Sequence, residues 1–331
     1  MVIFAPDANA EIVLGVSGLP LDEGVQAMNL KLAEAGLVPI FEDSDDPNSG
    51  EQARYRAVEG RDRFYPQRYF DVASVKDSVI PAPWGDIRIR IQEPIGPSDA
   101  TMVYFHGGGW IVGDLDSHKG EASLIANRAN CWVVQVDYRL APEDKFPAGV
   151  DDAIFATEWV AEHIDQFGGN LNKLCVGGGS AGGNLSAVVA LHCRDKGIPL
   201  AAQFLIYPAT HVRGVGGVEE RYLGSAVAEA ETNWKISPDV ADLSGVAPAI
   251  IGIGEHDFLF EDTCVFAQKL EQAGVTVLLR KYPTLNHGFF AYGPVTPVAE
   301  AASIEMSQDL ARALHGLDFP HHHINGDIKM K

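Results

Sequence analysis

The chain has 331 residues, of which 46% are hydrophobic and 21% are charged. This composition supplies a large apolar core and excludes an intrinsically disordered protein. Its 45 acidic and 25 basic residues give a net charge of −20, which repels phosphate backbones and anionic lipid surfaces. We therefore expect neither a nucleic-acid-binding protein nor a membrane-binding one.

The four cysteines are too few for a disulfide framework, and no two of them have the spacing of metal ligands. The first basic residue is Lys31, so no positively charged region begins the chain as in a secretory signal. No apolar run reaches the roughly 20 residues of a membrane-spanning helix. We expect a soluble cytoplasmic protein.

The pattern along the chain changes near residue 74. Before it, helical periodicity occurs at 24–35 and 51–64, and no strand pattern is present. After it, short apolar runs predict strands at 74–80, 86–92, 102–105, 132–136, 174–176, 204–207, 249–253 and 275–279. Helical stretches lie between several of them, at 117–130, 150–166, 185–196 and 261–273. Buried strands that alternate with helices predict an eight-stranded, mostly parallel sheet with helices on both faces.

The strongest motif is Gly-Gly-Ser-Ala-Gly at 178–182, directly after an expected strand, with Ser180 at its centre. A nucleophile elbow has this pattern, because its sharp turn leaves room only for small residues and lifts the serine hydroxyl above the sheet. Gly177, Gly179 and Gly182 also fit the dinucleotide-binding fingerprint. That fingerprint needs an acid after the next strand, where none occurs at 208–210, so the sequence favours the elbow.

A second glycine-rich loop, His-Gly-Gly-Gly-Trp at 106–110, follows the strand at 102–105. Glycines leave backbone N–H groups accessible to an approaching oxygen, as an oxyanion hole requires. The expected donors are the N–H groups of Gly108, Gly109 and Ala181. We expect His106 and Gly107 to support the loop. Alone, the loop at 106–110 is equally consistent with a turn that has no chemistry, and such a turn is the less favoured alternative for the segment at 178–182. The two segments together indicate a serine hydrolase.

A serine nucleophile needs a histidine base and a carboxylate that orients it, and in this fold they follow the serine in the order acid, histidine. His287 lies in a loop after the eighth expected strand, and Asp257 follows the seventh. The acids that compete with Asp257 are Glu255, Glu261 and Asp262. The last two fall in the first turn of a helix, where acids commonly cap the helix. The order and spacing favour Ser180, Asp257 and His287 as a catalytic triad.

With these motifs the sequence resembles the hormone-sensitive-lipase-like carboxylesterases, bacterial family IV of the α/β-hydrolase superfamily. The resemblance covers roughly residues 70–315. Further segments that carry it are 113–114, 136–143, 146–148, 206–208, 243–245 and 287–289. It implies an α/β-hydrolase fold and cofactor-free hydrolysis of carboxylic esters with short to medium acyl chains.

The resemblance also implies a division of the chain. An N-terminal helical cap is expected at 1–70 and the catalytic domain at 71–318, with 209–246 as a second cap segment and 319–331 as a loose tail. Two departures from the family pattern occur. Gly179 stands where the family commonly has aspartate, and the stretch 208–236 is shorter and poorer in aromatic residues than usual, which leaves the acyl-length preference open.

Other functions remain open at this point. An amidase or formamidase can use the same triad, and a non-catalytic ligand receptor can share the scaffold. The expected partner is a small ester substrate, and the assembly considered is a homodimer. The acidic residues concentrate at 1–50, with nine acids and one base, and at 209–262, with ten acids and three bases. Either this acidity maintains solubility in salt, or it makes the pocket entrance electronegative and favours neutral or cationic esters.

Overall fold

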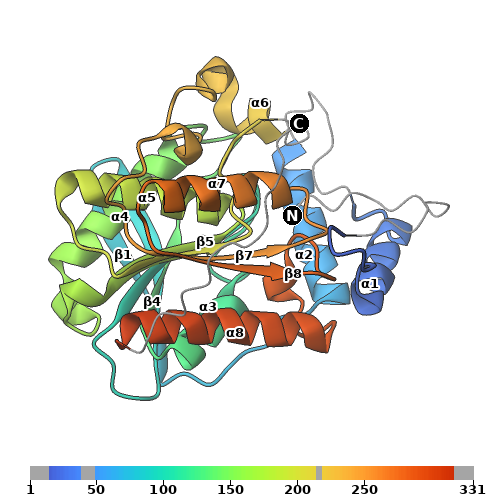
Figure 1. Cartoon of the computed structure of the whole chain (residues 1–331), viewed down its shortest axis with the longest axis horizontal. Coiled ribbons are helices and arrows are strands. Elements are labelled where there is room, and N and C mark those ends of the chain that lie inside the picture. The colour runs from blue at the N-terminus through green and yellow to red at the C-terminus, as the bar shows by residue number, and fades with distance from the viewer. Residues whose placement is uncertain (1–14, 39–48, 214–217, 317–331) are drawn as a thin grey trace.

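A computed structural model describes residues 15–38, 49–213 and 218–316 of the chain (Figure 1). The tail expected at 319–331 lies outside the described residues. Strands alternate with helices from residue 74 onward, and a single sheet runs through the middle of the molecule. None of the described helices has the length and apolar character needed to cross a membrane.

The sheet has eight strands in the order β1-β2-β4-β3-β5-β6-β7-β8. Their bounds are β1 Ser74–Ala82, β2 Gly85–Glu93, β3 Thr101–Phe105, β4 Trp132–Asp137, β5 Leu174–Gly179, β6 Ala202–Ile206, β7 Ala249–Gly254 and β8 Val277–Tyr282. β2 is antiparallel to β1 and β4, and the other neighbours are parallel. The predicted eight-stranded, mostly parallel sheet is confirmed. β8 begins later than expected because the N–H of Val275 caps the preceding helix by bonding to Leu270.

Helices cover both faces of the sheet, as predicted (Figure 1). α3 Lys119–Ala129 and α8 Pro297–Leu314 lie on one face, and α4 Ala148–Glu162, α5 Ala181–Lys196 and α7 Phe260–Gln272 lie on the other. The sequence analysis did not predict α8, although Thr296 and Pro297 give it a regular N-terminal cap. α5 begins four residues earlier than expected, immediately after Ser180.

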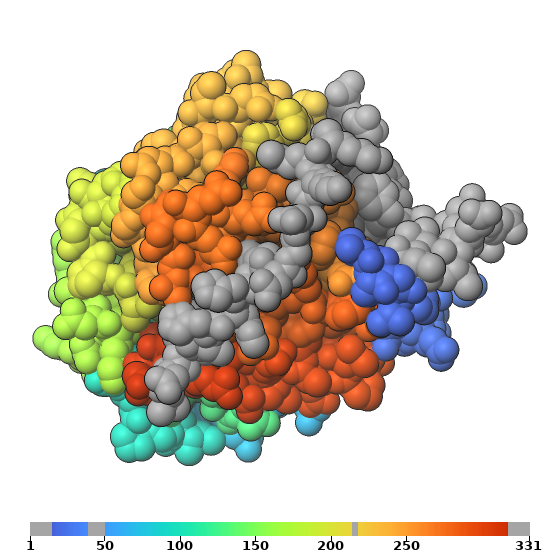
Figure 2. Space-filling model, viewed as in Figure 1, coloured from blue at the N-terminus to red at the C-terminus, as the bar shows by residue number. Residues whose placement is uncertain are grey.

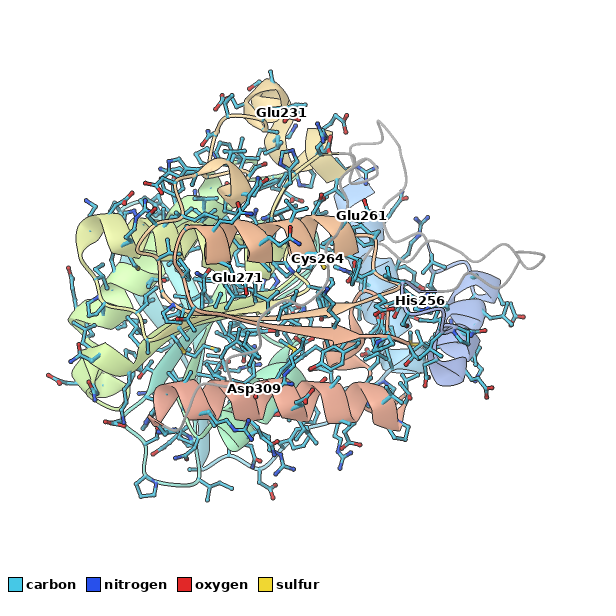
Figure 3. All side chains as sticks on the ribbon, viewed as in Figure 1. Glu231, His256, Glu261, Cys264, Glu271 and Asp309 are labelled. Carbon is cyan, nitrogen blue, oxygen red and sulfur yellow. The ribbon has the colours of Figure 1, made fainter. Side chains whose placement is uncertain are left out.

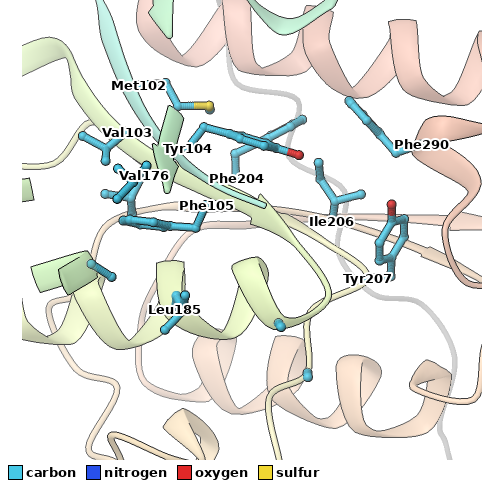
Figure 4. Packing of buried hydrophobic residues seen from close by; sticks show 14 of the residues in the cluster. Met102, Val103, Tyr104, Phe105, Val176, Leu185, Phe204, Ile206, Tyr207 and Phe290 are labelled. Carbon is cyan, nitrogen blue, oxygen red and sulfur yellow. The ribbon is translucent and has the colours of Figure 1, made fainter. Parts of the chain in front are cut away.

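Side chains of successive residues in β3 point to opposite faces of the sheet, so this central strand is buried on both sides. In Figure 4, Met102 and Tyr104 lie on one face, whereas Val103 and Phe105 lie toward Leu185 of α5. All five residues of β3 and all six of β5 are buried. This double burial explains why the two strands read as continuous apolar or glycine runs. It also fixes the loops that follow them.

The N-terminal helices are α1 Glu23–Glu34 and α2 Ser49–Phe64 (Figure 1). The residue that caps α1, Asp22, donates its backbone N–H to the carbonyl oxygen of Thr284 in the loop after β8. Arg54 of α2 donates hydrogen bonds to the carbonyl oxygen of Ile111 at 3.0 Å and to that of Ala141 at 3.2 Å. Its guanidinium also pairs with Glu143. These contacts attach α2 to the loops after β3 and β4, next to the site described below. In the space-filling view, α1 and the segment from α6 Val218–Leu223 onward occupy separate regions of the surface (Figure 2).

Candidate active site

Ser180 occupies a strained turn between β5 and α5. Its backbone has φ 55° and ψ −115°, a conformation that non-glycine residues rarely adopt. A Cβ atom at Gly178 or at Gly182 would come closer than 3.0 Å to the carbonyl oxygen of Phe105. Only glycine therefore fits at these two positions. The expected elbow, with a serine raised between two glycines, is present.

Ser180, His287 and Asp257 form one continuous chain of hydrogen bonds. Nε2 of His287 lies 2.9 Å from Oγ of Ser180, and Nδ1 of His287 lies 2.8 Å from Oδ2 of Asp257. The second carboxylate oxygen of Asp257, Oδ1, accepts the backbone N–H of Leu259 at 2.8 Å. Both oxygens of the carboxylate are thereby fixed in direction. The structure brings together the three residues that the sequence singled out, although 107 residues separate the serine from the histidine.

Aromatic side chains enclose the imidazole of His287. The ring centroids of Tyr207 and Phe258 each lie 4.7 Å from that of His287. His287 and Asp257 are both 5% exposed. Because little water reaches the pair, the hydrogen bond between them acts in a low-dielectric surrounding and holds the ring in one orientation.

The competing acids have other contacts. Oε2 of Glu255 accepts the backbone N–H of Ser17 at 2.7 Å. Glu261 and Asp262 lie in the first turn of α7, where the positive end of the helix dipole favours them. Among the described residues, Asp257 alone is the carboxylate hydrogen-bonded to His287.

The glycine loop after β3 packs directly against the elbow. A Cβ atom at Gly107 would meet the carbonyl oxygen of Gly179 at 2.9 Å. Gly108 and Gly109 have φ of 120° and 60°, values that favour glycine. Among the described residues, no backbone acceptor outside the helices and strands binds the N–H groups of Gly108, Gly109 and Ala181.

His106 holds the glycine loop in place through hydrogen bonds and ring stacking. Its Nδ1 donates to the carbonyl oxygen of Gly107 at 2.8 Å, and its ring stacks on Tyr138 with a centroid separation of 4.3 Å. The hydroxyl of Tyr138 in turn donates to the carbonyl oxygen of His106 at 2.8 Å. Burial lowers the pKa of His106 to about 4, so the ring is neutral at pH 7. These contacts match the supporting position expected for His106.

A cavity of about 190 Å³ opens in front of Ser180 and His287. Its walls come from α2, the loop after β3, α3, the loop after β8 and the start of α8. Three arginines and three carboxylic acids line it: Arg54, Arg61, Arg68, Asp114, Glu121 and Glu300. The loop glycines Gly107 and Gly108 form part of the wall beside the serine.

The expectation of an acidic entrance is wrong for the described lining. The charged side chains there are balanced, and none of the described residues of 209–262 lines the cavity. Figure 3 shows the reason, since Glu231 lies at the outer end of the segment after α6 and Glu261 lies on α7. Runs of charge in a sequence do not indicate which segments border a cavity. The acidic stretches at 1–14 and 39–48 lie outside the described residues.

The sequence analysis did not single out two residues of the cavity wall, Glu121 and Arg54. Glu121 belongs to α3 and is only 8% exposed, yet it lines the cavity. The sequence held a signal for it, because an acid stands between Gly120 and Ala122 in a helix with a largely apolar inner face. Arg54 was also missed, since its carbonyl partners lie 57 and 87 residues away along the chain.

The sheet order, the strained serine between β5 and α5 and the histidine after β8 define an α/β hydrolase. The family model described as alpha/beta hydrolase fold matches residues 102–291, which include the glycine loop, the elbow and the histidine loop. The chain therefore belongs to this family. The predicted fold class and the predicted family are both confirmed.

Similar proteins narrow the class further. The carboxylesterase NlhH of Mycobacterium tuberculosis is 40% identical over 253 residues, which cover 70% of this chain and 79% of that protein. The ethyl acetate hydrolase of Pseudomonas putida is 33% identical, with 65% of this chain and 74% of that protein covered. A solved esterase of Pyrobaculum calidifontis has a TM-score of 0.79 at 30% identity and covers 88% of this chain and 98% of its own. Together these matches support carboxylic ester hydrolysis as the activity class of this chain.

Proposed function

We propose that the chain is a serine carboxylesterase that hydrolyses esters of short to medium acyl chains through an acyl-enzyme on Ser180. The observation that carries the proposal is the hydrogen-bonded chain from Ser180 through His287 to Asp257, at the wall of a cavity large enough for a small ester. In this proposal the ester is the only substrate and no cofactor takes part.

The first step uses the hydrogen bond between Nε2 of His287 and the hydroxyl of Ser180. The imidazole removes the hydroxyl proton while Oγ attacks the ester carbonyl carbon. Asp257 keeps the proton of the imidazole on Nδ1, so that Nε2 is free to act as the base. The same carboxylate then stabilises the imidazolium that forms.

The carbonyl oxygen becomes negatively charged as the tetrahedral intermediate forms. In the proposal it is stabilised by the N–H groups of Gly108, Gly109 and Ala181. Their positions are fixed before the substrate binds, because His106 and Gly107 support the loop. The loss of one such donor typically lowers the rate about 10²–10³-fold.

The imidazolium of His287 next donates its proton to the leaving alkoxide, and the alcohol departs. A water molecule then gives a proton to Nε2 and attacks the acyl carbon, which releases the carboxylic acid and restores Ser180. We assign α1 and α2 to a cap over the acyl-binding cavity, because α2 contributes Arg54, Arg61 and neighbouring residues to its wall.

Hydrolysis of p-nitrophenyl esters with acyl chains from two to twelve carbons tests the proposal. We expect turnover on short and medium chains, and a fall of at least about 10⁴-fold for Ser180→Ala, with unchanged far-ultraviolet circular dichroism as the folding control. Ser123→Ala provides a matched substitution of a serine outside the triad and should retain activity. Near-native turnover by Ser180→Ala would refute the assignment.

The same assay distinguishes the two other functions. The two matched substrates are the butyryl ester of p-nitrophenol and the butyryl anilide of p-nitroaniline. They carry the same acyl group and differ in whether an ester bond or an amide bond is cleaved. An amidase would hydrolyse the anilide well above the background of Ser180→Ala, whereas a carboxylesterase would hydrolyse only the ester above that background. A receptor would hydrolyse neither, and its serine would not react with a fluorophosphonate.

A further inference from the structure

A buried carboxylic acid lies at the wall of the catalytic cavity, and the mechanism above does not use it. Glu121 is 8% exposed and lines the same cavity as Ser180 and His287. Glutamate is rarely buried to this extent without a charged partner. Its environment therefore indicates either a purely structural contact or a ligand that has yet to bind.

One oxygen of this carboxyl group has a protein partner. Oε2 accepts the hydroxyl of Tyr104 at 2.6 Å. The imidazole of His118 lies near Oε1, with its Nε2 at 3.9 Å, too far for a hydrogen bond. Burial holds the pKa of His118 well below its usual value, so this neighbour is neutral.

The arginines of the cavity wall do not neutralise Glu121. Each of them pairs with another acid in the described chain, Arg54 with Glu143, Arg61 with Asp62 and Arg68 with Glu300. The side chain of Glu121 nevertheless lines the cavity that holds Ser180 and His287, so the carboxyl group lies beside the space that the substrate enters.

Aromatic rings surround this polar position. Tyr65, Tyr207 and Phe290 line the same cavity as Glu121. In Figure 4 the hydroxyl end of Tyr104 points toward the side of the core that holds Phe290 and Tyr207. Aromatic surface combined with a few fixed polar groups is the usual arrangement of a pocket that orients its ligand.

We propose that Glu121 is a specificity-determining residue that binds a hydroxyl group carried by the acyl or the alcohol chain of the ester. The inference rests on the proposed esterase function and names a subclass of its substrates. Tyr104 is the positioning residue, because its hydroxyl holds Oε2 and so restricts the orientation of the carboxyl group.

A hydroxyl group fits this position better than a charged group. Burial raises the pKa of Glu121 to about 7, so both protonation states are present near neutral pH. A hydroxyl can donate to the ionised carboxylate and accept from the protonated acid, and so it pairs with either state. An ammonium group pairs only with the ionised form, and a carboxylate pairs only with the protonated one.

Matched esters with and without a terminal hydroxyl test the proposal. On the acyl side the pair is p-nitrophenyl hexanoate and p-nitrophenyl 6-hydroxyhexanoate, and on the alcohol side it is hexyl acetate and 6-hydroxyhexyl acetate. The corresponding pairs with eight-carbon chains place the terminal hydroxyl group farther from the serine. We expect the wild type to favour the hydroxy ester at least about tenfold in kcat/KM on one side, as for a hydrogen bond to an ionisable group.

The variant Glu121→Leu should abolish this preference, so that its kcat/KM values for the hydroxy ester and the plain ester become equal within a factor of about two. Glu300→Gln changes another carboxyl group of the same cavity wall and should keep the preference. If Glu121→Leu fails to fold because Tyr104 loses its acceptor, the double variant with Tyr104→Phe removes both polar partners and gives the same test.

The proposal is overturned if the wild type shows no preference in any pair, or if the preference persists after removal of the carboxyl group. A stronger preference for the 6-ammonio than for the 6-hydroxy ester would overturn the assignment to a hydroxyl. A purely structural Glu121 would change the thermal unfolding midpoint and not the ratio. Failure of the proposed esterase function is distinct from all of these, because the plain esters would then not be hydrolysed either.

Discussion

The carboxylate of Asp257 offers the sharpest test of how the triad is organised. In Asp257→Asn the amide oxygen is expected to stay where Oδ1 now accepts the N–H of Leu259 at 2.8 Å. The amide nitrogen then replaces Oδ2, 2.8 Å from Nδ1 of His287. An N–H donor at that position forces Nδ1 to accept, so the ring proton moves to Nε2.

A proton on Nε2 removes the base that Ser180 needs, while the shape of the site is preserved. In triads of this kind the change lowers kcat about 10⁴-fold. At about 1.4 kcal/mol for each factor of ten, this equals about 5 kcal/mol of transition-state stabilisation. The assay is the hydrolysis of p-nitrophenyl butyrate, with the thermal unfolding midpoint as the measure of folding.

Glu255→Gln is the matched control, because it neutralises the acid two residues away that bonds to Ser17. It should retain kcat within a factor of a few. The reasoning is refuted if folded Asp257→Asn retains kcat within tenfold of the wild type. It is also refuted if Glu255→Gln loses as much activity as Asp257→Asn.

Three further predictions concern packing, the attachment of α2 and pH. Gly182→Ala places a Cβ too close to the carbonyl oxygen of Phe105, so the backbone must move, and we expect a loss of about 1–3 kcal/mol in the free energy of unfolding by urea. Arg54→Gln removes charge-assisted hydrogen bonds to carbonyl oxygens that include that of Ile111, which should cost about 1–2 kcal/mol and raise KM. Burial raises the pKa of Glu121 from its ordinary value of 4.5 to about 7. Between these two pH values the carboxyl group keeps its proton in the native protein but has lost it in the unfolded chain. As the pH rises from about 4.5 to 7, the wild type should therefore lose stability relative to Glu121→Gln, by up to about 3 kcal/mol in urea unfolding.

Each of the three has a control. A Cβ atom at Gly60 lies 3.1 Å from the flexible end of Leu32 and otherwise makes ordinary van der Waals contact with Tyr65. Gly60→Ala should therefore change the unfolding free energy by less than about 1 kcal/mol. Arg63→Gln removes an exposed contact with Glu59 at 4.0 Å and should change it by less than about 0.5 kcal/mol. If variant and control gave equal effects in either pair, the packing or attachment argument would be wrong. For Glu121, a difference that stayed constant with pH would contradict the raised pKa.

Local stereochemistry explains why the elbow and the triad were predictable from the sequence. The small residues around Ser180 are required by the turn itself, whatever the rest of the chain does. Parallel strands place their carboxyl ends at one edge of a sheet, so residues that follow β5, β7 and β8 meet there. The chain order of Ser180, Asp257 and His287 then sufficed to select them from their rivals.

The features that escaped prediction depend on contacts between distant segments. Neither the bonds that Arg54 makes to the loops after β3 and β4 nor the partner of Glu121 leaves a periodic pattern in the sequence. The expectation of an acidic entrance is wrong for the described lining for the same reason, because the described residues of 209–262 do not line the cavity. The cap boundaries, the homodimer and the cytoplasmic location stay predictions.

Labelling with a fluorophosphonate and peptide mapping by mass spectrometry tests the central claim most directly. The account predicts one adduct per chain, on the Oγ of Ser180, with activity lost in proportion to labelling. Ser180→Ala should acquire no adduct, and Asp257→Asn should react far more slowly than the wild type. An adduct on another residue, or full inhibition of ester hydrolysis with Ser180 unmodified, would contradict the account.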